Sequence, residues 1–148
     1  MLDVAYIAVE DLPPGRLAQI DEDRGRVRVR VDRRAPLPDV IRQLNVEVDQ
    51  FLATSHWFQL WADEIVSRET PGCPLRVVYR IDPRAPEGDV AMGERKGLIT
   101  IYVSPAFNTE QFAAAMNPAT EEQLAGGRWF QMYAGEIIDN SPEPMSKV

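Results

Sequence analysis

A ten-residue stretch near the middle of the chain recurs close to its end. Residues 57–66 read WFQLWADEIV and residues 129–138 read WFQMYAGEII, so six of ten positions are identical at an offset of 72 residues. Aligned without gaps, residues 22–66 and 94–138 share 12 of 45 positions. Equivalent patterns favour equivalent elements, so the same order of elements should occur twice. We therefore predict a tandem duplication whose halves are related by a pseudo-two-fold.

The repeat divides the chain into a first unit at residues 1–72 and a second at residues 73–140, followed by a flexible tail at residues 141–148. A unit of about 70 residues has a marginal core by itself. We expect the two units to form one compact domain in which their sheets join.

Strict alternation marks the clearest strand of the first unit. Residues 26–31 alternate arginine with valine, which predicts a strand with its valines in the core and its arginines on the other face. Residues 4–9 and 17–20 are expected to add two strands, so that the three form a meander. A helix should then begin near Pro36, because apolar residues follow at spacings of three and four. These residues are Leu37, Ile41, Leu44, Val48 and Phe51.

The repeated stretch favours a β-hairpin, with a continued helix as the alternative. Strands at 57–61 and 64–68 would flank a two-residue turn, and Gly135 in the second copy supplies the positive φ that such turns need. In this register Leu60 lies opposite Ile65. We assign that face, which also carries Phe58, to the core.

The second unit repeats this order. Strands are expected at 75–81 and 98–103, and a helix capped by Asn108 or Thr109 should run to Met116. Asn117 and Pro118 are typical of a new helix start and would add a further turn or two. The predicted fold class is therefore α+β, a tandem duplication of a β-meander, a helix and a β-hairpin with mainly antiparallel sheet.

Composition bounds the classes of partner. The net charge is −7, and an acidic chain repels nucleic acid and anionic membrane surfaces. No apolar run approaches the ~20 residues needed to cross a membrane. No basic segment followed by an apolar one marks a signal peptide at the start. The lone Cys73 has no disulfide partner in the chain, which is typical of a reducing compartment. We expect a cytoplasmic protein without a membrane partner.

The residue types that carry catalysis are scarce. His56 and Cys73 are single representatives, whereas zinc sites need several such ligands. Adjacent carboxylates such as Glu121 and Glu122 point in different directions on a helix, so they are a poor acid–base pair. No glycine-rich phosphate loop is present. We predict no catalytic residues, no metal and no cofactor, and we interpret the chain as not an enzyme.

Aromatic residues of the repeated stretch are the first candidate site. If Phe58 and Leu60 fill the core, the opposite face is left for a protein partner or for a second copy of the chain. The predicted partner-binding residues are Trp57, Gln59, Trp61, Trp129, Gln131 and Tyr133. The competing interpretation is that these rings pack within the molecule.

An arginine cluster is the second candidate site. Residues 24–42 carry a local charge of +5, and alternate residues of a strand lie about 6.6 Å apart. Such a face could contact nucleic acid through Arg24, Arg26, Arg28, Arg30, Arg33 and Arg34. Its alternative is a solvated face with acidic neighbours. The leading hypothesis is a small non-catalytic binding or regulatory protein that acts through a protein partner. The alternatives are a nucleic-acid-associated protein and an enzyme that uses only carboxylates and arginine.

Overall fold

The fold is α+β. The computed structural model describes residues 2–54, 56–61, 63–72 and 74–141, so the predictions for Cys73, for the turn residue Ala62 and for residues 142–148 lie outside it. The described part of the first half contains β1 (Asp3–Val9), β2 (Ala18–Asp23), β3 (Arg26–Asp32), α1 (Leu37–Thr54), β4 (Trp57–Trp61) and β5 (Glu64–Ser67). The second half follows with β6 (Arg76–Ile81), β7 (Val90–Arg95), β8 (Leu98–Val103), α2 (Thr109–Ala125), β9 (Arg128–Tyr133) and β10 (Glu136–Asp139).

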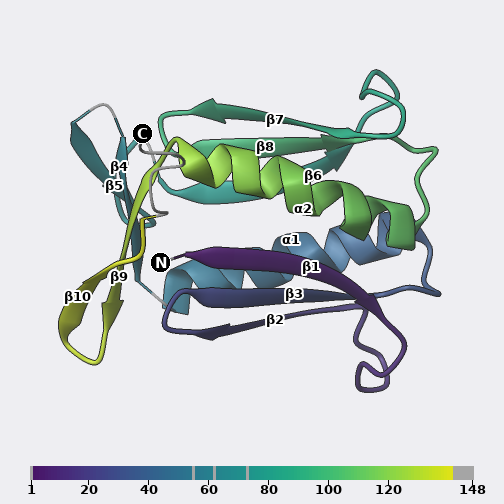
Figure 1. The fold of residues 1–148 in the computed structure, drawn as a ribbon, viewed down its shortest axis with the longest axis horizontal. Coiled ribbons are helices and arrows are strands. Elements are labelled where there is room, and N and C mark those ends of the chain that lie inside the picture. Colours follow the sequence, from purple (N-terminus) through teal and green to yellow (C-terminus); the bar gives the residue numbers. More distant parts are fainter. Residues whose placement is uncertain (1, 55, 62, 73, 142–148) are drawn as a thin grey trace, which may run out of the picture.

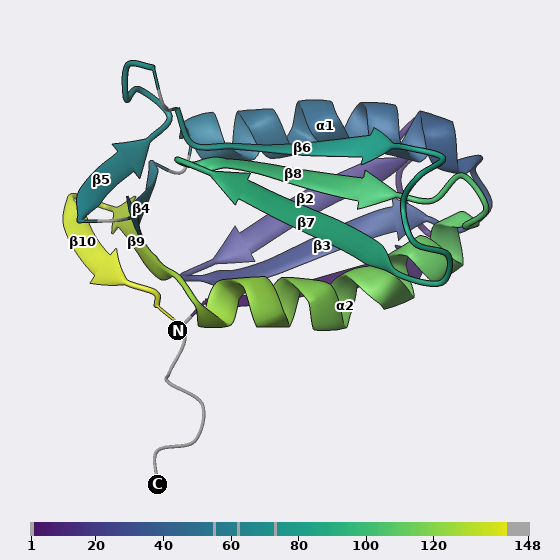
Figure 2. The same cartoon turned by 90° about the horizontal axis from the view of Figure 1, so that it is seen from above.

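Two three-stranded sheets face each other and enclose the core (Figure 1). One has the strand order β1-β3-β2 and the other β6-β8-β7. Viewed from above, the two helices lie along opposite sides of this pair (Figure 2), because α1 packs on β2 and β6 while α2 packs on β1 and β7. A four-stranded sheet of order β10-β9-β4-β5 covers one end. Each helix therefore packs on a strand from the other half, across the predicted boundary between residues 72 and 73.

The predicted meander is wrong, although the sheets are mainly antiparallel as expected. A meander would place β1 beside β2, but β1 pairs with β3 in parallel and β2 pairs with β3 antiparallel. The second half has the same arrangement of β6, β8 and β7. The parallel pair is possible because β2 runs back along the far side of β3. The residues between β1 and β2 thus form a crossover rather than a tight hairpin.

The second helix is longer than predicted. It runs from Thr109 to Ala125 with Pro118 inside it, where two shorter segments were expected. Asn108 caps it, since its side chain accepts the Gln111 backbone N–H at 2.7 Å. Asn117 does not start a new helix, because it lies inside α2. Its side chain forms hydrogen bonds with the backbone of Tyr6 on β1. In addition, β7 occupies residues 90–95, where no strand was predicted.

Two helix asparagines close the outer edges of β1 and β6. Both strands lie at the edge of a sheet, where backbone groups have no partner strand. Asn117 on α2 accepts the Tyr6 N–H at 2.7 Å and donates to the Tyr6 carbonyl at 3.1 Å. Asn45 on α1 does the same for Tyr79, at 2.8 Å and 3.0 Å. Each asparagine thus replaces one rung of a β-ladder, at two positions that the sequence repeat aligns.

The side chains of Tyr6 and Tyr79, whose backbones bond the two asparagines, contact each other in the core. Tyr6 and Tyr79 are buried, and their hydroxyl groups hydrogen-bond to each other. Phe112 of α2 packs edge-on against both rings, with centroids 6.2 Å and 6.1 Å away. Burial raises the pKa of Tyr6 to about 12, since an ionised phenolate would be poorly solvated there. This cluster joins the two halves at the centre of the molecule.

Candidate functional site

The four-stranded sheet is built from the two copies of the repeated stretch. Each copy forms a hairpin as predicted, and Leu60 lies opposite Ile65 as predicted. The hairpins join through antiparallel pairing of β4 with β9, in which Phe58 is opposite Phe130. Trp57 pairs with Gln131 and Gln59 with Trp129, so the register is the same read from either half. In the second hairpin Ala134 and Gly135 have φ of 51° and 83°, the positive values of a type I′ turn.

The predicted facing of these hairpins is wrong. Trp57, Gln59, Trp129 and Gln131 were predicted to bind a partner, but only 3%, 2%, 6% and 1% of their surfaces are exposed, as the competing interpretation of packing within the molecule expects. They lie on the inner face, over the open end of the two three-stranded sheets. Both faces of the strands are largely apolar, so the alternation indicates two faces without indicating which is covered.

Trp61 and Tyr133 lie at the margin of that inner face. Trp61 is half-buried and packs against the core, while 38% of Tyr133 is exposed. The Arg24 guanidinium lies 5.0 Å from the centroid of the Tyr133 ring, a cation–π contact. Of the six residues predicted to bind a partner, these two alone retain substantial exposure.

The outer face of the same sheet carries the exposed apolar residues. Pairing places Phe58 beside Phe130, Leu60 beside Ile65, and Met132 beside Ile137. Exposure reaches 66% at Ile65, 70% at Ile137 and 41% at Met132, while the other three are half-buried. We call these six residues the outer apolar face. A contiguous exposed apolar patch is typical of an interaction site.

Charges around the outer apolar face are mainly acidic. The two hairpins and their flanks carry Asp63, Glu64, Glu69, Glu136 and Asp139 against Arg68 and Arg128. Arg128 lies 3.5 Å from Asp139 and its guanidinium is 5.4 Å from the Phe130 ring centroid. Hydrogen bonds from Ser141, followed by the nearby Arg128, lower the pKa of Asp139. An apolar centre with an acidic rim favours a partner with an apolar centre and a basic rim.

The arginine strand has the predicted facing. Val27, Val29 and Val31 are buried, and the arginines between them point to the opposite face. Acidic side chains of neighbouring strands stand beside them, since Arg28 lies 3.0 Å from Asp3 and Arg30 lies 3.4 Å from Asp21. Arg26 is exposed opposite Asp3 and Asp23 in the ladder. The arrangement matches a solvated, charge-balanced sheet face.

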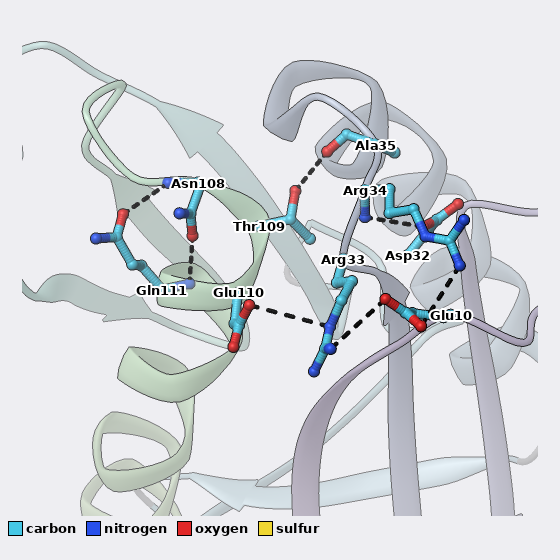
Figure 3. A network of polar contacts seen from close by, with 9 residues as sticks. All are labelled: Glu10, Asp32, Arg33, Arg34, Ala35, Asn108, Thr109, Glu110 and Gln111. Carbon is cyan, nitrogen blue, oxygen red and sulfur yellow. Dashed lines mark hydrogen bonds and ion pairs between the residues drawn. The ribbon is translucent and has the colours of Figure 1, made fainter.

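The remaining arginines of the cluster take part in a network between the halves (Figure 3). Arg33 and Arg34 share Glu10, at 3.7 Å and 3.4 Å, and Arg33 reaches Glu110 of α2 at 4.0 Å. The Thr109 hydroxyl donates to the Ala35 carbonyl at 2.8 Å in the same region. These contacts tie the start of α2 to the loop before α1, so the two arginines have a structural explanation.

Sequence reasoning missed a second basic face. In the sheet β6-β8-β7 the outward positions of β8 are Leu98, Thr100 and Tyr102, without charge. The flanking strands add Arg76, Arg80 and Arg95, all exposed, and no outward position of these three strands is acidic. Arg76 is 3.9 Å from Asp49 of α1. The signal was present as two arginines four residues apart in β6, which share one face of the strand, but they become part of a patch only when the strands are placed side by side.

No group of three or more histidine, cysteine, aspartate or glutamate side chains in the described part of the chain could hold a metal ion. A groove of about 470 Å³ runs between α2 and β7 and contains Asp89, Glu94 and Glu122. Gln123 donates to Glu94 at 3.1 Å, which ties one of these carboxylates to the helix. Neither described helix is both long and apolar enough to span a membrane.

Comparison with protein-family models, with curated proteins and with solved structures finds no match to this chain.

Proposed function

We propose that this protein is a non-catalytic binding module that engages a protein partner through the outer apolar face. The single observation that carries the proposal is the exposure of Ile65 and Ile137, 66% and 70%, at equivalent positions on the two edge strands of the sheet. Large apolar side chains grouped in this way are unfavourable in water and favour association.

The partner we propose has an apolar docking surface with a basic rim. Acidic residues of the hairpin tips would then face opposite charge, which speeds encounter and suppresses wrong partners. A second copy of this chain would bring acidic rims together, so self-association is the less favoured occupant. Regulation of that partner in the cytoplasm is the role that we propose for the module.

We also propose that the chain arose by tandem duplication and that its halves are related by a pseudo-two-fold passing between Phe58 and Phe130. The equal order of elements, the equivalent asparagine clamps and the symmetric register of β4 with β9 support this. The outer apolar face would then present two equivalent halves, suited to a two-fold or extended partner.

Site-specific crosslinking tests the docking surface. A photoreactive residue placed at Ile65 or Ile137 in the native host should give one discrete adduct. The matched control is Val46 of α1, which is 53% exposed on another surface and should give none. Equal adducts at all three positions would contradict the proposal. Sedimentation of the purified protein decides whether a second copy is the occupant, because a dimer abolished by Ile137→Thr would identify it.

Nucleic-acid association remains the second candidate, and the outer face of β6-β8-β7 favours it over the arginine strand. Arg80 lies opposite Tyr102, and Arg76 and Arg95 flank Leu98 further along the same face, so this face offers phosphate contacts and a stacking ring. Three contacts to a single strand imply a log–log salt slope of about −2. Replacing Arg76, Arg80 and Arg95 with glutamine should flatten that slope, whereas the same change at Arg26, Arg28 and Arg30 should not. Absence of oligonucleotide binding at low salt would remove this candidate.

A further inference from the structure

The two three-stranded sheets have their outer edges at β1, β2, β6 and β7, and helix side chains hydrogen-bond to three of these edges. Asn117 bonds the edge of β1, and Asn45 bonds the edge of β6. On β2 the Gln43 side chain of α1 accepts the Ala18 N–H at 2.8 Å. Backbone groups at a sheet edge can pair with a further strand. These three side chains occupy positions where such a strand would bind.

The remaining edge, β7, has no such helix side chain. The 72-residue offset of the repeat aligns Gln43 with Ala115 and Ala18 with Val90. The methyl group of Ala115 accepts no hydrogen bond, and the Val90 N–H is bonded instead by the side chain of Asp89 at 2.8 Å. Among the described residues, no helix side chain hydrogen-bonds to the backbone of β7.

A groove lies beside this edge at a place that is filled in the first half. There, Glu47 of α1 forms an ion pair with Arg16, just before β2, at 3.2 Å. The same offset aligns Glu47 with Ala119 and Arg16 with Gly88. Small residues thus stand where the first half has a salt bridge, and the groove of about 470 Å³ between α2 and β7 is open.

The edge of β7 presents main-chain groups along this groove. β7 pairs with β8 antiparallel, so alternate residues of β7 point their N–H and C=O groups away from the sheet. The N–H of the aligned Ala18 points away from its sheet, so Val90, Met92 and Glu94 do the same at a period of two. All three residues of β7 line the groove. An extended segment in the groove would find the donors and acceptors of a further β-ladder.

Acidic side chains determine which kind of segment fits. Asp89 lies just before β7 and Glu122 lies on α2, and both are exposed in the groove. Glu94 lies five residues beyond Asp89, about 17 Å along a strand. None of the described residues that line the groove is basic. Opposite charge speeds encounter and suppresses wrong partners, so the groove favours a segment with basic side chains.

We propose that β7 and α2 form a docking groove for an extended basic segment of a partner protein, which adds to the edge of β7 as a fourth strand. Main-chain hydrogen bonds to Met92 and Glu94 hold the segment, and its basic side chains contact Asp89 and Glu122. In this mode the backbone supplies affinity and the side chains supply specificity. The groove is separate from the outer apolar face, so this inference does not depend on the docking surface proposed there.

Selection from a library of random peptides of about seven residues, long enough to span the groove, tests the proposal with the full-length protein as bait. Enriched peptides should carry arginine or lysine and lack acidic residues. Their binding should slow hydrogen exchange at the amides of Met92 and Glu94, and leave the aligned amides of Ile20 and Glu22 on β2 unchanged. Absence of enrichment, enrichment without basic residues, or protection confined to other strands would overturn the proposal.

Variants separate the strand edge from its charges. Ala115→Gln copies Gln43 and should weaken the selected peptides by roughly 10-fold or more, the scale of two lost hydrogen bonds. Glu122→Gln should weaken them roughly 2- to 5-fold and reduce the salt dependence, since exposed ion pairs contribute little. The matched control is Glu121→Gln, an exposed neighbour that does not line the groove, which should leave affinity unchanged. If Ala115→Gln fails to fold, the two glutamate variants decide, because equal effects would contradict the proposal.

Discussion

The two faces of the four-stranded sheet come from the same repeated residues but differ in what covers them. The inner face presents Trp57 and Trp129, which are 3% and 6% exposed, whereas the outer face presents Ile65 and Ile137, which are 66% and 70% exposed. Both faces are apolar enough to form a core. The inner face is buried because it covers the open end of the two three-stranded sheets. The hydrophobicity of the strands does not decide which face is buried, since it is similar on both faces.

The largest expected effect is on the inner face. Trp129→Ala should destabilise the protein by about 3–5 kcal/mol, because it removes a buried ring that seals the core. Met132→Ala on the outer side of the same strand should change stability by no more than about 0.5 kcal/mol. Urea denaturation midpoints of the two variants measure the difference. Equal losses would mean that the two faces do not differ in burial as described.

A second comparison lies within the inner face. Asn140 donates to the Gln131 side chain at 3.0 Å, whereas the side-chain oxygen of the equivalent Gln59 is buried without a partner. Gln131→Leu should therefore cost about 1–3 kcal/mol, since it leaves a buried amide unpaired. Gln59→Leu should be close to neutral, because it removes an oxygen that is already unsatisfied. Chemical denaturation measures the free energy of unfolding of both variants. A larger loss of stability for Gln59→Leu than for Gln131→Leu would mean that Gln59, and not Gln131, makes the stabilising hydrogen bond.

Substitutions on the outer apolar face should leave folding nearly unchanged and weaken binding. Ile65→Thr and Ile137→Thr keep a β-branched residue in the strand and should shift stability by about 0.5 kcal/mol or less. Once the crosslinked partner is in hand, each change should weaken its binding by about 2 kcal/mol, the scale of a hot spot. Val46→Thr is the matched control and should leave partner affinity intact. A large fall in melting temperature would show that this face is covered.

The smallest effect concerns Asp139 on the outer face. Its folded-state pKa lies below the unfolded value, so the stabilisation is present above about pH 4. It is lost as the pH falls through the folded-state pKa, because the unfolded chain then gains its proton first. Asp139→Asn should remove this small acid-dependent component, since exposed ion pairs contribute little. The free energy of unfolding measured at pH 7 and at pH 3 checks this. If its pH dependence is the same in the variant, Asp139 does not contribute to the acid-dependent stability.

Several elements were predictable because they rest on local patterns. The alternation of residues 26–31 and the apolar spacing of α1 matched the observed burial, and the hairpin register of Leu60 with Ile65 followed from turn length. The parallel pairing of β1 with β3 was not predictable in this way, since strand order depends on contacts between distant residues. The role of Asn117 was also out of reach, because an asparagine before a proline is typical of a helix start.

In the candidate sites, too, local features were predictable and features that depend on distant residues were not. Sequence reasoning found the repeated stretch and the arginine cluster, but it reversed the inner and outer faces of the former. It could not place Asp3 and Asp21 beside the arginines, nor gather Arg76 and Arg95 on one face, because these residues are brought together only by strand order.

By itself the sequence determined most of the strands, the first helix and the hairpin registers, since backbone geometry and turn chemistry act over a few residues. Only the tertiary structure decided which apolar face closes the core and which charges meet. The physical reason is that burial is a property of layers. A face is inside only when another layer covers it, and here that layer is built from strands of both halves of the chain.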